Sequence, residues 1–423
     1  MNTKKNKKTL LSLFSGCGGM DIGFEGGFEV TKPSVNTQIH PNWISKKYTR
    51  PGWVYLRPND FVTVFANDIS MPAKLAWESY FQRQNTFHLG SIIDYIRSAK
   101  NNGINIFPKK VDIVTGGFPC QDFSVAGKRK GFQSHKSHNG VLLEDYDEPT
   151  LENRGMLYSW MREVISLVRP KVFIAENVKG LISMENVKEI IERDFRNIGE
   201  NGYIVFSKVL HAAEYGVPQS RQRIIFIGLL KKSLKKNILA SIENGNLNKE
   251  LYPFPRQTHF IKSNLCTASD KLLPFVNCGT VLKGLPEPFK AKDLCQINYS
   301  KAKWMGKHCQ GQTEVKLESL GPTIRSEHHG NIEFRRLSAG HGGNKHDELH
   351  KGLIERRLTI RECARIQSFP DDYHFIIPKG NGQRGFFVSA SDAYKIIGNA
   401  VPPFLAYHIA RRLQELWDVY FKK

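Results

Sequence analysis

The strongest constraint on the fold is the regular alternation of short apolar runs with helix-like segments in the first half of the chain. The apolar runs are rich in Val, Ile and Phe and are too short for helices, which favours buried strands. They are LLSLF (10–14), VTVFAND (62–68), VDIVTGG (111–117), VFIAEN (172–177) and RIIFIGL (223–229). Between them, the segments 72–81, 155–168 and 186–198 carry apolar residues at helical spacing. This alternation predicts an α/β, doubly wound sheet with helices on both faces.

The texture of the sequence changes at about Lys231, where lysine-rich, proline-broken stretches begin. No clear periodicity returns until LTIRECARIQSF, which predicts a second, smaller and irregular domain. The last segment opens with prolines suited to a helix start. Its expected buried stripe is Leu405, Ile409, Leu413, Leu416 and Val419. The expected division is an α/β domain at 1–230, an irregular domain at 231–357, a connecting segment at 358–384 and a return to the first domain at 385–423.

Basic residues outnumber acidic ones, with 61 Lys and Arg against 40 Asp and Glu and a formal net charge of +21. A surplus of this size favours a polyanionic partner, and nucleic acid heads the candidates. An anionic membrane surface is the alternative, but no apolar run approaches the roughly 20 residues of a spanning helix. The basic start is followed by a stretch too short for a secretory leader, so a cytoplasmic protein is expected.

The cysteines are seven in number and widely spaced, which is typical of reduced thiols rather than of a disulfide framework. Cys278, Cys295, His308 and Cys309 could be combined as zinc ligands. Because no CxxC pair supports that combination, no metal site is expected.

Glycines cluster directly after the first expected strand, in LLSLFSGCGGMDIGF. Gly16, Gly18 and Gly19 would let the backbone turn tightly and approach a nucleotide-like ligand. The dinucleotide fingerprint GxGxxG is not matched, because Asp21 stands where its third glycine should fall. The next strand ends at Asp68, where a carboxylate commonly accepts hydrogen bonds from ribose hydroxyls. The alternative is that the glycines form only a turn and that Asp68 caps a helix.

Cys120 stands just past another expected strand, in GGFPCQDFSVAGKRKGF. Ligand sites of open α/β sheets collect at the carboxyl ends of strands. A lone cysteine is most often a small core hydrophobe. Here, however, two glycines and Pro119 precede it and a basic loop (128–130) follows. A partly exposed thiol near basic groups has a lowered pKa, so the context predicts a nucleophile.

Two further strand ends supply a carboxylate and two arginines. Glu176 ends the strand VFIAEN, and a carboxylate buried at a sheet is costly unless it is used. Arg221 and Arg223 alternate at the entry of the next strand, so both can point to one face. A solvated basic edge is the alternative for the arginines. Together, a nucleophile, an acid and arginines are what attack on an electron-poor ring requires.

The motifs occur in a fixed order along the chain: FSGCGG, the strand end Asn67-Asp68, GGFPCQDFS, NRGMLY, ENV, QSRQR, RLTIRECARIQSFPDDY and GNAVPP. With these blocks the chain resembles, over nearly its whole length, the cytosine-5 DNA methyltransferase family, typified by modification enzymes of bacterial restriction systems. The resemblance implies a Rossmann-like sheet that binds S-adenosylmethionine, a target-recognition domain at 231–357 and a double-stranded DNA substrate. It also implies a companion restriction endonuclease and a monomeric enzyme.

The resemblance carries site residues over by position. The catalytic residues would be Cys120, Glu176, Arg221 and Arg223. The S-adenosylmethionine site would be Phe14, Ser15, Gly16, Cys17, Gly18, Gly19, Asp68, Ile69, Pro119, Asn399 and Ala400, from both ends of the chain. DNA contacts are expected from Gln121, Ser124, Arg325, His328, His329, Arg335 and Arg336, which are residue types that bind phosphates or base edges.

The sequence departs from the family pattern in the adenine pocket and in two insertions. Ser91 stands where the family usually has an aspartate near the adenine amine, and Ile69 replaces an aromatic stacking residue. Insertions at 31–60 and 133–153 lengthen the chain. Adenine recognition is therefore expected to differ in this chain.

The implied reaction begins with attack of Cys120 on carbon 6 of cytosine, which makes carbon 5 nucleophilic. Glu176 would act at N3, and Arg223 with Arg221 would hold the base. The target nucleotide must be flipped out of the duplex. The rivals are an RNA methyltransferase acting on transfer RNA, which the long region 231–357 disfavours, an inactive DNA-binding regulator, and a nicotinamide oxidoreductase.

Overall fold

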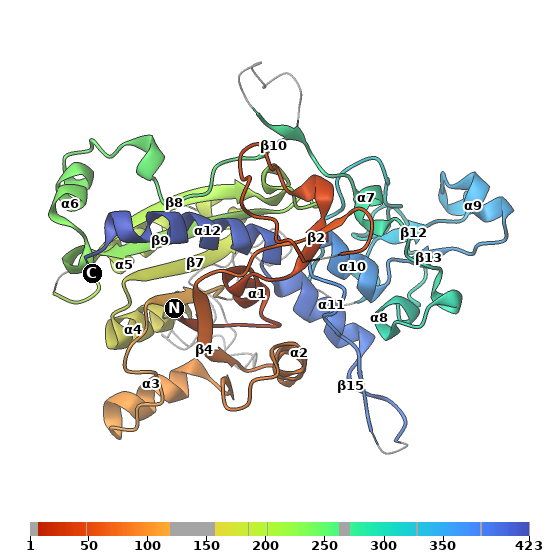
Figure 1. The fold of residues 1–423 in the computed structure, drawn as a ribbon. Helices are drawn as coiled ribbons and strands as arrows, with labels where there is room; N and C mark the ends of the chain where they lie inside the picture. The colour runs from red at the N-terminus through yellow and green to blue at the C-terminus, as the bar shows by residue number, and fades with distance from the viewer. Residues whose placement is uncertain are drawn as a thin grey trace.

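A seven-stranded sheet forms the centre of the molecule (Figure 1), in the order β5-β4-β1-β6-β7-β9-β8. The computed structural model describes residues 7–47, 49–118, 157–184, 186–200, 202–261, 271–326, 329–380 and 383–422. The strands are β1 (Lys8–Leu13), β4 (Phe61–Asp68), β5 (Phe87–Leu89), β6 (Ile113–Gly116), β7 (Val172–Val178), β8 (Tyr203–His211) and β9 (Gln222–Leu230). All are parallel except β9, which runs against both of its neighbours. The order reverses at β1, and open α/β sheets hold ligands at such a point, beyond the carboxyl ends.

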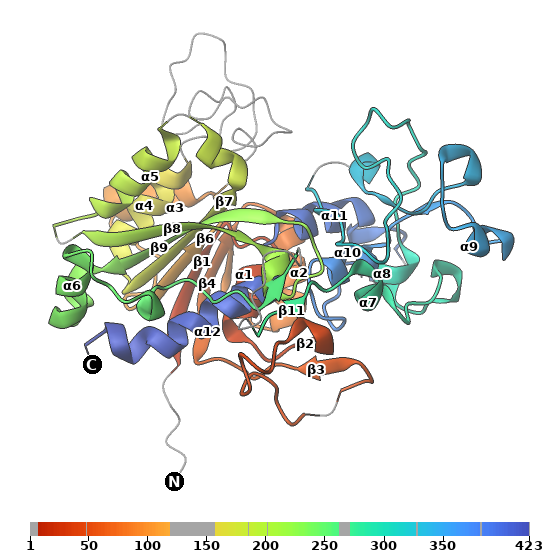
Figure 2. The same cartoon turned by 90° about the horizontal axis from the view of Figure 1, so that it is seen from above.

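Helices cover both faces of this sheet (Figure 2). The helices around the sheet are α1 (Gly19–Glu25), α2 (Met71–Phe81), α3 (Ile92–Asn101), α4 (Leu157–Val168), α5 (Val187–Arg196) and α12 (Pro403–Tyr420). One apolar cluster joins α1 and α12 to one face, and a second joins α3, α4 and α5 to the other. The predicted doubly wound α/β class is therefore confirmed.

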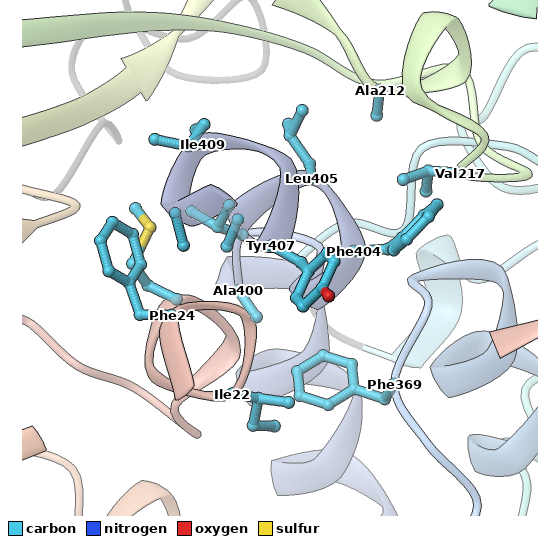
Figure 3. Close-up of a cluster of buried hydrophobic side chains, with 14 of the residues drawn as sticks. Ile22, Phe24, Ala212, Val217, Phe369, Ala400, Phe404, Leu405, Tyr407 and Ile409 are labelled. Carbon is cyan, nitrogen blue, oxygen red and sulfur yellow. The ribbon is translucent and has the colours of Figure 1, made fainter. Parts of the chain in front are cut away.

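The last helix packs against the first, so the two ends of the chain share one core (Figure 3). Phe24 of α1 and Phe404, Leu405 and Tyr407 of α12 are all buried there. The approach is close because α1 carries a glycine at the contact: a Cβ on Gly23 would lie 2.4 Å from the Cβ of Ala406. Pro403 begins α12, as the sequence suggests.

Most expected elements are found, with three differences. All five expected strands exist, with ends shifted by at most two residues. Strands β5 and β8 were missed, β5 because it is short and β8 because Ser207 and Lys208 interrupt its apolar pattern on a half-exposed edge. Val419 is 38% exposed, so its place in the buried stripe was wrong, whereas Leu405, Ile409, Leu413 and Leu416 are buried. No helix in the described ranges has the length and apolar content to cross a bilayer.

The rest of the chain forms short elements beside the sheet. They are β2 (Glu29–Thr31), β3 (Trp53–Tyr55), α6 (Lys236–Glu243), β10 (His259–Phe260), β11 (Leu273–Pro274), α7 (Cys278–Leu282), α8 (Leu294–Ile297), β12 (Phe334–Arg336), α9 (His346–His350), β13 (Arg356–Arg357), α10 (Ile360–Ile366), β14 (Ile377–Pro378), β15 (Phe386–Val388) and α11 (Ala390–Asn399). Leu234 pairs with Phe421, and Thr258 donates to the Glu214 carbonyl at 3.0 Å. Contacts between the segment after β9 and the rest of the first domain thus continue beyond Leu230, and the domain division at residue 231 stays a prediction.

The irregular region around β12, β13 and α10 is held by ion pairs rather than by long strands. Arg356 is 3% exposed and contacts Glu287 at 2.9 Å and Glu362 at 2.8 Å. Arg336 is fully buried and contacts Glu287 at 2.8 Å and Glu348 at 2.6 Å. Since breaking a buried pair leaves an uncompensated charge, these contacts fix the geometry of the region.

Candidate active site

The turn from β1 into α1 is fixed to the end of β4 by backbone hydrogen bonds. The Ser15 amide donates to the Asn67 carbonyl at 2.9 Å, and the Asn67 amide donates to Ser15 Oγ at 3.0 Å. Phe14, Gly16 and Gly18 have left-handed backbone angles, with φ of 50°, 52° and 77°. This conformation aims the turn's backbone at the space beyond the strands, as the glycine motif predicts.

Asp68 organises this turn through both carboxylate oxygens. Oδ2 accepts from the Gly16 amide at 2.9 Å, and Oδ1 accepts from the Ser70 amide at 2.9 Å. Burial raises the pKa of Asp68, and these backbone hydrogen bonds oppose that rise. An ionised carboxylate has about four acceptor positions, so each oxygen retains capacity for a ligand hydroxyl. Asp68 thus holds the turn and can still accept from a ribose.

Cys17 takes a different place from its neighbours in the predicted cofactor set. Its side chain is fully buried, and its thiol donates to the Ile396 carbonyl at 3.2 Å. Burial raises the pKa of this thiol, and its own carbonyl accepts from the Tyr373 hydroxyl at 2.7 Å. Cys17 therefore ties the turn to α11 through its buried side chain.

The end of α11 reaches the same turn from the far end of the chain. A Cβ on Gly19 would lie 2.2 Å from the Val401 carbonyl and 3.2 Å from the Ala400 Cβ. Asn399 is exposed beside them. The structure therefore brings GNAVPP against the glycine turn, as the resemblance implies.

The two departures in the adenine pocket lie next to Asp68. Ile69 is 55% exposed. Ser91 precedes α3 and makes no capping hydrogen bond, and the Gly90 amide before it donates to the Asp68 carbonyl at 3.1 Å. The aligned positions are thus neighbours in space.

A carboxylate–arginine pair joins the carboxyl end of β7 to the amino end of β9. Arg223 Nε lies 2.8 Å from Glu176 Oε1, and the two side chains are 14% and 8% exposed. A Cβ on Gly117 would lie 3.0 Å from Glu176 Oε2. Asn177 Nδ2 donates to the Phe118 carbonyl at 3.2 Å. The backbone leading to Cys120 therefore passes directly beside Glu176.

Several predicted site residues lie outside the described residues. These are Pro119, Cys120, Gln121, Ser124 and His328, together with the side chain of His329. Their roles stay predictions.

Arg221 forms hydrogen bonds to other parts of the protein than Arg223 does, and its expected role in holding the base stays a prediction. Its side chain is 1% exposed and donates to the carbonyls of Ile324 at 3.1 Å and Gly398 at 3.0 Å. The physical reason is the turn before β9, where the Arg221 carbonyl accepts from the Ala212 amide at 2.8 Å. Arg221 joins the sheet to the irregular region and to α11.

Two of the arginines predicted to contact DNA are already satisfied within the protein. Arg336 is fully buried in the ion pairs described above, so its assignment to DNA was wrong. Arg335 is 14% exposed and contacts Glu348 at 3.1 Å. Arg325 is 32% exposed and contacts Glu333 at 2.9 Å, so it is the most accessible of the three. The sequence alone does not show that these carboxylates, which are distant along the chain, lie beside the arginines.

Other residues that shape the site were not predicted. Gln219 Nε2 donates to Gln367 Oε1 at 2.5 Å, and Gln367 Nε2 donates to the Ala400 carbonyl at 2.5 Å. These two hydrogen bonds link the QSRQR block to Ala400, which lies beside Gly19 of the β1–α1 turn. Its only sequence signal is that both glutamines stand in family blocks. Among the described residues, no group of three His, Cys, Asp or Glu side chains is arranged to hold a metal ion.

A glycine turn at the switch point of the sheet, with a carboxylate–arginine pair at a neighbouring strand end, places the protein in the class of open α/β folds with a ligand site at this edge. Residues 8–415 match the family model described as C-5 cytosine-specific DNA methylase. The chain belongs to this family and is a DNA cytosine-5 methyltransferase.

Relatives of the chain agree with this family. The type II methyltransferase M.FnuDI of Fusobacterium nucleatum is 28% identical over 96% of this chain and 94% of its own length. M.BspRI of Lysinibacillus sphaericus, also a type II methyltransferase, is 29% identical over 99% and 84%. The crystal structure of the S. pombe Dnmt2 methyltransferase has a similar fold, with a TM-score of 0.53 at 17% identity, over 97% of this chain and 99% of that one.

Proposed function

We propose that this enzyme transfers a methyl group from S-adenosylmethionine to carbon 5 of a flipped-out cytosine in a specific double-stranded DNA sequence, with Cys120 as the covalent nucleophile. The observation that carries the proposal is the Glu176–Arg223 pair, which lies against Gly117, three residues before Cys120. An acid and a cation beside the nucleophile's loop are the groups that attack on a cytosine ring requires.

The residues of the β1–α1 turn fit S-adenosylmethionine. A Cβ on Gly16 would meet nothing within 4 Å, so this glycine faces open space beside the Asp68 carboxylate. Asp68 would accept from the ribose hydroxyls, and the exposed Asn399 would close the site. The cofactor supplies an electrophilic methyl group on a sulfonium. Phe14 and the backbone of 15–19 would hold it against the turn.

Adenine would be bound without the family's usual acid. The exposed Ile69 side chain offers an apolar surface for one face of the ring. The Ser91 hydroxyl, which makes no capping bond, would accept from the adenine amine. A neutral hydroxyl is a weaker acceptor than a carboxylate, so this contact would contribute less to affinity.

The chemical step uses three side chains. The Cys120 thiolate forms a bond to carbon 6, and the displaced ring electrons are neutralised by a proton held between N3 and Glu176 Oε2. Arg223 occupies Oε1 and keeps the carboxylate oriented. S-adenosylmethionine held at the β1–α1 turn would supply the methyl group to carbon 5, with its bond from the methyl group to sulfur broken and S-adenosylhomocysteine left as the product. Loss of the carbon 5 proton to a base restores the ring double bond and releases the thiolate.

The biological setting is also a proposal. The relatives named above are type II methyltransferases. On that ground we propose that the chain is the monomeric, cytoplasmic modification enzyme of a restriction–modification system, paired with an endonuclease for the same site. Transfer RNA is not a favoured substrate, because the family model and the curated relatives describe DNA or type II enzymes. Within the recognition region, Arg325 is the best candidate for a DNA contact.

Transfer of labelled methyl groups tests this function. We expect label from S-adenosylmethionine to enter duplex DNA at one sequence, and DNA from expressing cells to resist one restriction endonuclease. The matched control is Arg223→Ala, which should retain cofactor binding and lose transfer. Label found only in transfer RNA would contradict the proposal.

A further inference from the structure

The amino ends of the parallel strands, opposite the active site, carry a group of lysines. Lys8 begins β1, Lys110 stands just before β6, and Lys171 directly precedes β7. Strand β9 runs the other way and delivers Lys231 and Lys232 to the same edge. The site residues lie at the other ends of these strands. Seven residues of β7 span about 20 Å at the usual rise per residue, so the two edges are well separated.

Contacts around the end of α12 bring these lysines together. Lys8 Nζ and Lys171 Nζ lie 5.2 Å and 5.8 Å from the Trp417 ring centroid. The Lys235 amide donates to the Tyr420 carbonyl at 2.8 Å. In both views the C-terminal end of the chain lies near α6 (Figures 1 and 2). We name this surface the lysine edge: Lys7, Lys8, Lys109, Lys110, Lys171, Lys231, Lys232, Lys235, Lys236 and Lys422.

Few carboxylates balance this surface. Asp112 is engaged by Thr9, whose amide donates to it at 2.9 Å. Among the residues that the structure describes, the lysines that lie within 4 Å of a carboxylate include Lys74, Lys100, Lys188 and Lys345, all outside the lysine edge. Asp60 lies at this edge as well, and its carbonyl accepts from the Lys8 amide at 2.8 Å. The remaining charges add to a local positive field, which attracts polyanions.

We propose that the lysine edge binds the phosphate backbone of a second segment of double-stranded DNA while the target segment occupies the active site. The lysine ammonium group is a point charge and lacks the planar pair of donors with which arginine recognises base edges. Binding by the lysine edge is therefore independent of the DNA sequence. The substrate is a long polymer, which places a second segment at high effective concentration. The enzyme would thereby stay on long DNA between methylation events.

The lysine edge lacks the features that a surface needs to bind the other polyanionic partners, a membrane or a single-stranded nucleic acid. Trp417 and Phe421 are 7% and 3% exposed, and only Val419 among the large apolar residues of 417–422 is appreciably exposed. A membrane-surface helix needs an exposed apolar face. Single-stranded nucleic acid needs exposed aromatic rings for base stacking. Duplex phosphate is therefore the favoured ligand.

A triple variant, Lys109→Gln/Lys110→Gln/Lys232→Gln, tests the proposal against a matched variant, Lys32→Gln/Lys46→Gln/Lys208→Gln. All six lysines are exposed, and the control set lies away from the lysine edge. The first readout is kcat/KM for a short target duplex and for the same target in kilobase-length DNA. The edge variant should keep its value on the short duplex and fall by on the order of tenfold on long DNA. The control variant should change neither.

The second readout is binding of a labelled duplex without the target site to enzyme already saturated with the short target duplex. For the edge variant, the slope of log K against log salt should fall by about 2 to 3, near 0.9 for each lost phosphate contact. Equal behaviour of the two variants on long DNA would overturn the proposal. The proposal would also be overturned if the edge variant lost binding to phosphatidylglycerol vesicles or to single-stranded RNA while its activity on long DNA stayed unchanged. The lysine edge would then bind that other ligand.

Discussion

The cofactor turn and the irregular region around β12, β13 and α10 are built by different physical means. The turn is fixed by backbone hydrogen bonds from Ser15 and Gly16 to the end of β4. The irregular region is fixed by arginine side chains, such as Arg356 with Glu287 and Glu362. The backbone geometry of the turn requires glycines at particular positions, so it can be recognised as a local sequence motif. The ion pairs join residues that are distant along the chain. The structure of the turn can therefore be predicted from the sequence, and that of the irregular region cannot.

The largest effect is expected from breaking the ion pairs. Arg356→Met should lower the free energy of unfolding by about 3–5 kcal/mol, because it leaves buried Glu362 without its bidentate partner. Urea unfolding measures this loss. Arg193→Met is the matched control, since Arg193 is 66% exposed and 3.6 Å from Asp194, and it should cost less than about 1 kcal/mol. Similar losses in the two variants would mean that ion pairs do not fix the irregular region.

The two arginines of QSRQR should separate stability from catalysis. Arg221→Ala removes two hydrogen bonds to buried carbonyls and should cost about 3 kcal/mol of stability. Arg223→Ala should lower kcat by on the order of 100-fold or more with a smaller stability loss, because Arg223 orients the Glu176 carboxylate.

Thermal unfolding and single-turnover methylation distinguish these outcomes. Arg221→Lys should recover part of the stability lost in Arg221→Ala, since one donor group remains. A normal melting temperature with abolished methylation in Arg221→Ala would place this residue in the catalytic set.

The smallest effect is a difference in pH dependence between the two regions. Burial raises the pKa of Asp21, beside the turn, from 3.8 to about 6. The contribution of this pKa shift to the stability of the folded protein is therefore full below pH 3.8 and is lost as the pH rises to about 6. Arg365 lowers the pKa of Asp371 from 3.8 to about 2, despite burial, so its contribution is lost as pH falls from 3.8 to about 2. Although burial raises the pKa of Glu287, Arg356 and Arg336 lower it overall, as Arg365 does for Asp371.

Hydrogen exchange at different pH values, corrected for intrinsic exchange rates, tests this difference. Between pH 7 and pH 4, amides of α1 should become relatively more protected. Below pH 4, amides of α10 should lose protection first. Parallel changes in both helices would remove the electrostatic part of the comparison, as would a loss of protection in α1 on acidification to pH 4.

Local patterns in the sequence were sufficient for the fold class and the cofactor turn. Gly16 and Gly18 have the left-handed angles that their motif requires, and Asp68 binds the turn they form. The strand ends also placed Glu176 and Arg223 close together. The two side chains meet because the carboxyl end of β7 and the amino end of the antiparallel strand β9 lie at the same edge of the sheet.

The failed predictions concern side chains whose partners are distant in sequence. Arg336 looks like a DNA contact until Glu287 and Glu348 neutralise it, and Glu287 is 49 residues away. The hydrogen bonds of Arg221 to the Ile324 and Gly398 carbonyls, 103 and 177 residues away, were likewise not predicted. Neither arrangement leaves a local pattern. The edge strand β8 was missed because its apolar pattern is interrupted on an exposed side.

Covalent trapping on 5-fluorocytosine tests the central claim most directly. Fluorine at carbon 5 blocks the final elimination, so duplex DNA with this base at the target should form a denaturation-resistant adduct, only when S-adenosylmethionine is present. Cys120→Ser should abolish the adduct, because a hydroxyl is far less ionised and less nucleophilic than a thiol. Cys309→Ser, at a free and partly exposed cysteine, should leave it intact. An adduct that persists in Cys120→Ser, or that is lost in Cys309→Ser, would contradict the assignment of the nucleophile.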